Sequence, residues 1–394
     1  MSIFILFIFF FLRHIWIPIN ADVLPVLGIS PCLYSGSYDE SGNYGLVSPM
    51  PISSLPLECT SFIYDGLIYV DNLDINPNAQ SLGIIRGLMN SGKKYFLFYT
   101  HGSLENWIKS LENLDVNVEK NKMLLYFNQY SVTGLILKDI DYNFDSGLTY
   151  HIDAYFYSSL RDYINNIKRT FINLKVGLYL NASSILYHDK NPTTQDFVDF
   201  TQLNGAVDFY IIGFDGFNPC NKDFRNGTVP LNGSHSLMTL SKALNASSID
   251  RNKVYLELYA NPIIDSSESI LPMSGITYTK LCEDSKKKNE WCADNSDSFY
   301  EKAKFAKETI KAQGIVTKYI DRIDPTGACN CDSKNQFITF KMILRGFKLE
   351  DPITDCTALN KICYLNNQNL SVDSRTHSAL ILTIVPILFE AVQM

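Results

Sequence analysis

VTGLILKDIDYNF, residues Val132 to Phe144, has the pattern of a buried strand that opens into a polar site. Its short apolar run, Leu135 to Leu137, passes directly into a segment with two aspartates, Asp139 and Asp141. Parallel strands that are covered on both faces have such continuous apolar runs. We therefore expect functional side chains where this strand ends.

Further segments along the chain are short, rich in β-branched, aliphatic or aromatic residues, and bounded by Gly, Pro, Asn or Ser. These predicted strands are Val23–Leu33, Ser61–Val70, Tyr95–Thr100, Lys175–Leu180, Val207–Phe214, Val254–Tyr259 and Gly314–Ile320. Helical patterns lie between them, at Gln80–Asn90, Val118–Gln129 and Asp153–Ile172. With the opening stretch this makes eight strands interleaved with helices, which predicts an α/β fold of the (β/α)8 TIM-barrel type. Periodicity leaves a doubly wound open sheet as the alternative, although no Gly-x-Gly-x-x-Gly turn follows the first strand.

The composition limits the partners. The 394 residues carry a net charge of −7, whereas nucleic acids and anionic membranes select basic surfaces. The chain is long enough for one large domain, and we expect the barrel to span residues 22–350. Nucleic acid is therefore not an expected partner.

Both ends of the chain have features of a secreted protein. Residues 1–21 are interpreted as a signal peptide, although Arg13 follows the apolar block, so an uncleaved anchor is the alternative. Residues 351–372 form a Cys-containing extension, and the apolar tail at 373–394 resembles a lipid-anchor signal, interrupted by Glu390. A plain C-terminal tail is the other interpretation, and a lipid anchor is the only membrane contact we expect. Five glycosylation sequons fit this compartment: Asn181, Asn226, Asn232, Asn245 and Asn369.

The nine cysteines indicate disulfides in an oxidising compartment, with at least one cysteine left unpaired within the chain. Cys329 and Cys331 do not have the usual spacing of zinc ligands, and no His lies near them. We expect no metal site and no cofactor.

In their order and spacing, many partial motifs resemble the family 18 glycoside hydrolases, the chitinases and chitinase-like proteins. The motifs that carry this resemblance are Cys32 with Cys59, Val207-Asp208-Phe209 followed by Phe214-Asp215, Tyr255–Tyr259, Ile276–Cys282, and Phe299–Gly314 followed by Ile315–Asp324. The resemblance implies a disulfide between Cys32 and Cys59 and a short insertion between barrel strands seven and eight. It covers Val23 to about Phe347.

The family's signature, Asp-Gly-x-Asp-x-Asp-x-Glu on strand four, falls on the opening stretch. Its Glu protonates the leaving oxygen, while the substrate's own acetamido group acts as the nucleophile. One alignment retains Asp139, Asp141 and Tyr142, places Asn143 at the Glu, and leaves Lys138 facing the helices. The other alignment is anchored on Gly134 and places Lys138 at the second Asp and Ile140 at the Glu.

Neither alignment supplies the acid, because no Glu occurs between Glu119 and Glu257. An Asn has no proton to donate at neutral pH. Asp141 is the alternative acid, with a shorter side chain. In the simpler interpretation, Asp139 and Asp141 only close the loop after the strand.

The resemblance also implies ligand contacts at Tyr99, Tyr142, Phe214, Asp215, Tyr259 and Lys318. Lys318 takes the place of the Trp on which the sugar stacks, and Phe214 that of a Tyr that binds the acetamido carbonyl. His101 follows strand three, and we interpret it as a surface-loop residue.

The sequence therefore predicts a secreted or surface-tethered chitinase-like protein without catalytic activity. It would bind chitin or N-acetylglucosamine-type glycans, or an extracellular protein, at the barrel mouth. The alternative is an active family 18-type hydrolase, a chitinase or chitobiase, with a displaced acid. A third hypothesis is a scaffold whose glycosylated outer surface alone matters.

Overall fold

The computed structural model describes residues 25–37, 48–71, 74–75, 79–113, 116–141, 155–190, 198–215, 217, 228–233, 235–264, 276–283, 291–329, 331 and 336–360. The predicted signal peptide, the apolar tail, Tyr142, Asn143, Asn226 and Asn369 lie outside these residues. The extension at 351–372 is described only as far as residue 360.

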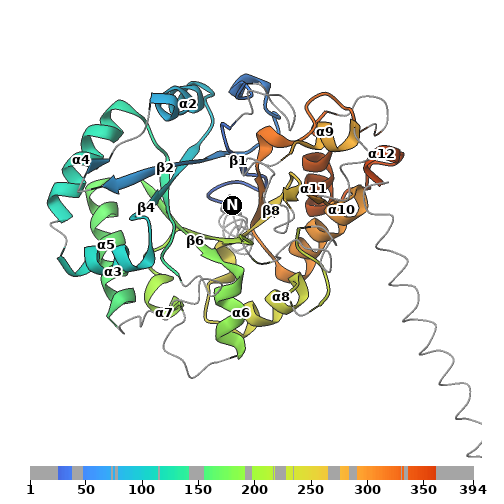
Figure 1. Ribbon diagram of the computed structural model, residues 1–394. Helices are drawn as coiled ribbons and strands as arrows, with labels where there is room; N and C mark the ends of the chain where they lie inside the picture. The colour runs from blue at the N-terminus through green and yellow to red at the C-terminus, as the bar shows by residue number, and fades with distance from the viewer. Residues whose placement is uncertain are drawn as a thin grey trace, which may run out of the picture.

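Within the described residues, eight parallel strands close into a barrel that is surrounded by helices (Figure 1). The strands pair in the order β1-β11-β8-β7-β6-β5-β4-β2, and β1 pairs with both β11 and β2, which closes the ring. Their bounds are β1 Cys32–Tyr34, β2 Phe62–Asp71, β4 Tyr95–Thr100, β5 Gly134–Leu137, β6 Lys175–Asn181, β7 Phe209–Gly213, β8 Val254–Tyr259 and β11 Gly314–Lys318. The predicted (β/α)8 barrel is confirmed, and the doubly wound alternative is wrong.

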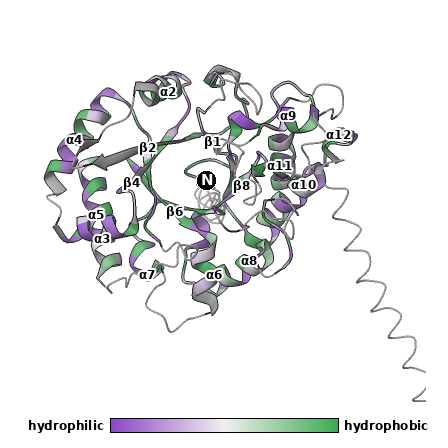
Figure 2. Cartoon of the chain, viewed as in Figure 1, coloured by the Kyte–Doolittle hydropathy of each residue, from purple (hydrophilic) through white to green (hydrophobic). Residues whose placement is uncertain are grey.

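Helices cover the outside of the ring, and α3 and α5 are strongly amphipathic; Figure 2 shows hydrophilic and hydrophobic residues side by side along these two. Their bounds are α2 Ala79–Asn90, α3 Leu104–Asn113, α4 Val116–Gln129, α5 Phe156–Thr170, α6 Ala182–Lys190, α7 Phe200–Leu203, α8 Leu237–Ala246, α10 Ser296–Phe305, α11 Ile338–Lys348 and α12 Thr357–Asn360. Short 3-10 turns lie at η1 Ile52–Ser54, η3 Arg251–Lys253 and η6 Ile320–Arg322, and a π-helical segment, η5 Ala306–Ile310, directly follows α10. No helix in the described part of the chain is long and apolar enough to cross a membrane.

The expected insertion lies between β8 and β11, the seventh and eighth strands of the barrel. It contains the antiparallel pair β9 (Ile263–Ile264) and β10 (Trp291–Cys292), with α9 (Tyr278–Glu283) between them. Another short strand, β3 (Asp74–Ile75), pairs antiparallel with the end of β2.

The predicted first strand, Val23–Leu33, is too long. Gly28 has a φ of 78°, and its N–H donates to Pro25 O at 2.8 Å. This turn interrupts the extended backbone, and β1 has only three residues, although Ile29 O and Pro31 O still accept hydrogen bonds from Ile315 N and Thr317 N of β11.

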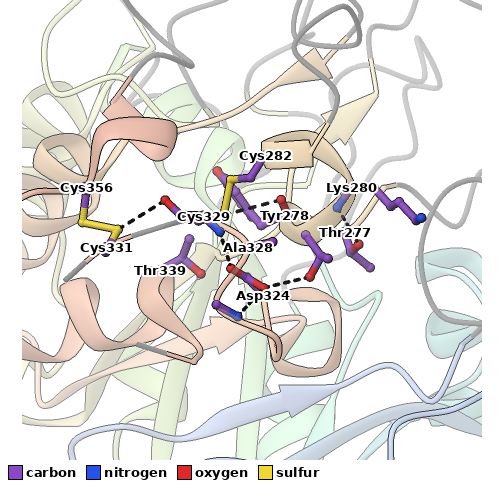
Figure 3. The surroundings of a disulfide bond; sticks show 12 residues. Thr277, Tyr278, Lys280, Cys282, Asp324, Ala328, Cys329, Cys331, Thr339 and Cys356 are labelled. Atoms are coloured by element: carbon purple, nitrogen blue, oxygen red, sulfur yellow. Dashed lines mark hydrogen bonds between the residues drawn. A yellow bond between two sulfur atoms is a disulfide. The ribbon is translucent and has the colours of Figure 1, made fainter. Parts of the chain in front are cut away.

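Three disulfides join described residues, and one of them is the predicted Cys32–Cys59 bridge. Figure 3 shows the other two, in which Cys329 bonds to Cys282 of α9 and Cys331 bonds to Cys356. The Cys-x-Cys pair is thus a disulfide element that fastens both the insertion and the C-terminal extension to the loop after β11.

That loop is also held by Asp324, a buried residue in the same view (Figure 3). One carboxylate oxygen accepts hydrogen bonds from Thr279 Oγ1, Gly327 N, and both Thr326 N and Oγ1, at 2.8 to 3.1 Å. The other accepts from Cys329 N at 2.7 Å. A buried carboxylate needs such donors, because burial without them is costly.

Aromatic and aliphatic side chains together fill the interior of the barrel in the described residues. Phe96, Phe209 and Tyr255 pack edge to face with centroid distances of 5.6 and 6.0 Å. Room for them comes from Gly177, where an added Cβ would lie 2.1 Å from the Phe209 ring.

Gly177→Ala should therefore destabilise the protein by about 1–3 kcal/mol through overpacking. The matched control is Gly83→Ala in α2, where nothing lies within 4 Å of the added Cβ; there Ala should stabilise the helix by up to about 1 kcal/mol. Urea unfolding measures both. Equal midpoints for Gly177→Ala and the wild type would contradict this packing.

Candidate functional site

A buried ammonium group, that of Lys318, lies at the mouth of the barrel. Lys318 is the last residue of β11, and its Nζ lies 2.7 Å from Asp215 Oδ1 and 3.1 Å from Glu257 Oε1. The side chain of Lys318 is 3% exposed and that of Glu257 is 0% exposed, whereas that of Asp215 is 39% exposed. The cluster thus has a buried floor, and Asp215 is its most accessible carboxylate.

Two tyrosines complete the cluster. Tyr179 Oη lies within hydrogen-bond distance of Glu257 Oε1 at 3.0 Å and of Asp215 Oδ2 at 3.2 Å, and its one proton serves either oxygen. The Tyr259 hydroxyl donates to Asp215 Oδ1. The Tyr259 ring centroid lies 4.7 Å from Lys318 Nζ, a cation–π distance.

The environment separates the acidities of the two carboxyl groups. Burial raises the pKa of Glu257 to about 7, and the charge of Lys318 only partly opposes this effect. Burial also acts on Asp215, but the charge and hydrogen bond of Lys318 outweigh it and hold the pKa of Asp215 well below its usual range. Burial lowers the pKa of Lys318, but its acidic neighbours, Glu257 first, raise this pKa well above the usual value.

Lys138 also lies inside the barrel. Its Nζ is 5.2 Å from the ring centroid of Phe98 and 5.4 Å from that of Tyr179, and both rings belong to the interior cluster. The expectation that Lys138 faces the helices is therefore wrong. Lys138 takes the inward position that the alignment on Gly134 gives it.

The strand pattern stops immediately after Lys138. Asp139 has a φ of 60°, so the chain turns, and Asp139 accepts a hydrogen bond from Thr100 Oγ1 at 2.6 Å. Ile140 is buried in the outer cluster between strands and helices. The structure thus agrees with the alignment on Gly134 at Lys138. At Ile140 it does not, because Ile140 lies outside the barrel interior.

Asp141 joins the end of this turn to α6. Its Oδ2 accepts from Asn181 N at 2.6 Å and from Ser184 Oγ at 2.9 Å. Desolvation raises the pKa of Asp141 to about 7, against these two hydrogen bonds, which lower it. These contacts are those of a loop-closing residue.

Two expected ligand residues face away from the mouth. Tyr99 is 1% exposed, and its hydroxyl donates to Glu119 in the helical layer. The reason is strand alternation, since its neighbour Phe98 points inward. Phe214 is 2% exposed and packs against Phe217, with ring centroids 5.2 Å apart.

His101 is likewise not a surface-loop residue. It is 7% exposed, lies with its ring centroid 3.9 Å from that of Trp107, and has Nε2 3.4 Å from Glu119 Oε1. The Trp107 indole N–H in turn donates to Lys138 O at 2.9 Å. This packed cluster supports the turn from outside the barrel.

Of the expected ligand residues, Asp215, Tyr259 and Lys318 are brought together. Tyr179 and Glu257 were missed, and only Glu257 gave a signal: it is a charge within the apolar strand Val254–Tyr259, two residues before Tyr259 and hence on the same face. Within the described ranges, no group of three or more His, Cys, Asp or Glu residues is arranged to hold a metal ion.

Searches by sequence find no matching family model and no matching curated protein. Solved structures do match. A catalytic domain of the Group II chitinase of Ostrinia furnacalis matches with a TM-score of 0.61 at 12% identity, over 82% of this chain and 97% of that domain. A GH18 chitinase of Cycas revoluta in complex with (GlcNAc)3 matches with a TM-score of 0.57 at 11% identity, over 81% of this chain and 100% of that one.

Human YKL-39, described as a pseudo-chitinase with retained chitooligosaccharide binding, matches with a TM-score of 0.54 at 14% identity, over 85% of this chain and 99% of that one. The structural neighbours thus include both chitinases and a pseudo-chitinase. At these identities the likeness concerns the fold. The chain has the (β/α)8 fold of the chitinases and chitinase-like proteins.

Glu257 should make stability depend on pH. Between its ordinary pKa of 4.5 and its folded value of about 7, the folded state holds a proton that the unfolded state has lost. Stability therefore falls as pH rises through this window, by up to about 1.4 kcal/mol per pH unit for this group. Glu257→Gln should remove this contribution and leave that of Asp141, whose pKa burial also raises to about 7.

Chemical denaturation at intervals from pH 4.5 to 7 measures the slope, with the exposed Glu350→Gln as the control for net charge. The assignment fails if Glu257→Gln and the wild type lose stability in parallel across the window.

Proposed function

We propose that this protein is a secreted or surface-tethered chitinase-like protein that binds N-acetylglucosamine-type glycans at the barrel mouth without hydrolysing them. The observation that carries the proposal is the position of Lys318 between Asp215 and Glu257. Lys318 keeps Asp215 ionised, and Glu257 is fully buried, so neither carboxyl group is positioned to give a proton to an incoming glycosidic oxygen.

The chemistry of glycoside cleavage makes this pairing decisive. A general acid must reach the leaving oxygen, and its contribution is typically about 10²–10⁴-fold. Glu257 has a pKa near 7, suitable for an acid, but it is fully buried beneath Lys318. Asp215 is accessible, but Lys318 keeps it ionised.

Glycan binding without cleavage needs no proton donor, only groups at the mouth that contact the sugar. Tyr259 is half-buried with its ring beside Lys318, and Asp215 offers an accessible carboxylate to sugar hydroxyls. One solved neighbour is described in complex with (GlcNAc)3, and a pseudo-chitinase among the neighbours is described as retaining chitooligosaccharide binding. An extracellular protein partner at the same mouth is the other form of this proposal.

Secretion is supported by the three disulfides, by the sequons and by the predicted signal peptide at residues 1–21. Surface tethering rests on the apolar tail at 373–394. If that tail directs a glycolipid anchor, phosphatidylinositol-specific phospholipase should release the protein from intact cells. Retention after treatment counts against the anchor.

An active hydrolase with a displaced acid is the second candidate function. The observation in its favour is that burial raises the pKa of Asp141, in the loop after β5, to about 7. A general acid works best when its pKa lies near the operating pH.

Calorimetric titration with chitotetraose, paired with product analysis after prolonged incubation, distinguishes these functions. We expect binding without cleavage, and about tenfold weaker binding for Tyr259→Ala, because one aromatic contact is worth about 1.4 kcal/mol. Tyr155→Ala, at an exposed tyrosine just before α5, is the control and should bind as the wild type.

Cleavage that Asp141→Asn or Glu257→Gln abolishes would establish the hydrolase instead. If no sugar binds, the glycan-binding form is wrong, and the protein-partner form is the one to test.

A further inference from the structure

Asn181 combines a glycosylation sequon with a position at the barrel mouth. It is the last residue of β6, and with Ala182 and Ser183 it forms the acceptor sequence Asn-x-Ser. The carboxyl ends of barrel strands form the mouth, so the side chain of Asn181 begins where the polar cluster lies.

Direct contacts fix the orientation of this side chain. Asn181 Nδ2 donates to Asp215 O at 2.7 Å, and Asn181 Oδ1 accepts from Ser183 N at 3.0 Å and Ser183 Oγ at 2.8 Å. The amide nitrogen therefore lies against the residue whose carboxylate contacts Lys318 and Tyr259.

We propose that Asn181 carries an N-linked glycan whose first sugars occupy the mouth of the same barrel and compete with external ligands. The inference rests on the proposed glycan-binding function. An N-linked glycan begins with β-linked N-acetylglucosamine, which is the ligand chemistry proposed for this mouth.

The attachment chemistry is compatible with the observed contacts. The Asn181 amide nitrogen attacks C1 of the first sugar, an N–C bond forms, and the C–O bond to the lipid pyrophosphate donor breaks. One of the two amide protons is lost to a base in the transferase. The remaining N–H retains a donor for Asp215 O.

Tethering makes even a weak internal ligand effective. A sugar joined to a residue at the site has an effective concentration on the order of millimolar. It would thus occupy the mouth unless an external glycan binds more tightly or is present in excess.

The chain provides a matched control at another sequon. Asn245 is exposed at the end of α8, in the outer helical layer, and its side chain is not part of the polar cluster. A glycan there should not affect the mouth.

The test measures chitotetraose binding by calorimetry in protein secreted from a glycosylating host. The wild type is measured before and after enzymatic removal of N-glycans. The variants Ser183→Ala, Ser183→Thr and Asn245→Gln are measured beside it. Peptide mass spectrometry measures occupancy of Asn181 in each sample. We expect Asn181 to be occupied in the wild type, and binding to strengthen about tenfold or more on deglycosylation and in Ser183→Ala. Ser183→Thr keeps the sequon and Asn245→Gln leaves Asn181 intact, so both should bind as the wild type.

Unmodified Asn181 in the secreted protein would overturn the inference. Equal affinity with and without a glycan on Asn181 would overturn it as well, while leaving glycan binding itself intact. Absence of binding in every form, deglycosylated protein included, would overturn the proposed function together with this inference.

Discussion

The mouth of this barrel depends on one buried ion pair network, in which Lys318 lies between Asp215 and Glu257. Removing an ammonium from water costs several kcal/mol, and only close, well-oriented partners offset that cost. Lys318 has two carboxyl groups within 3.1 Å, and two tyrosine hydroxyls contact the same carboxyl groups. The ends of β7, β8 and β11 are thereby held in one arrangement.

This network shapes the chemistry available at the mouth. Lys318 stabilises the charged form of Asp215, while burial favours the protonated form of Glu257. Two carboxyl groups with separated acidities are the usual starting point for acid–base catalysis. Here Glu257, the protonated group, is fully buried, and Asp215, the accessible group, is ionised. This arrangement is suited to holding a ligand through hydrogen bonds rather than to protonating it.

The sequence predicted the barrel because its strands are short, apolar and separated by helices. The partial motifs also predicted the Cys32–Cys59 bridge and the grouping of Asp215, Tyr259 and Lys318. Prediction from the sequence failed where the direction of a side chain depends on local backbone geometry.

Tyr99 was assigned to the mouth although its neighbour Phe98 takes the inward position. The left-handed turn at Asp139 interrupts the two-residue alternation, which no spacing argument anticipates. The role of Glu257 as a partner of Lys318 is visible only in the folded chain, because Lys318 lies 61 residues further along the sequence.

A carbon NMR titration of the side-chain carboxyl groups tests the central claim most directly. The network predicts that Glu257 titrates with a midpoint near 7, while Asp215 stays ionised well below its ordinary value of 3.8. A midpoint for Asp215 at its ordinary value of 3.8 would show that Lys318 does not pair with it, and a midpoint for Glu257 at 4.5 would show that Glu257 is not buried as described.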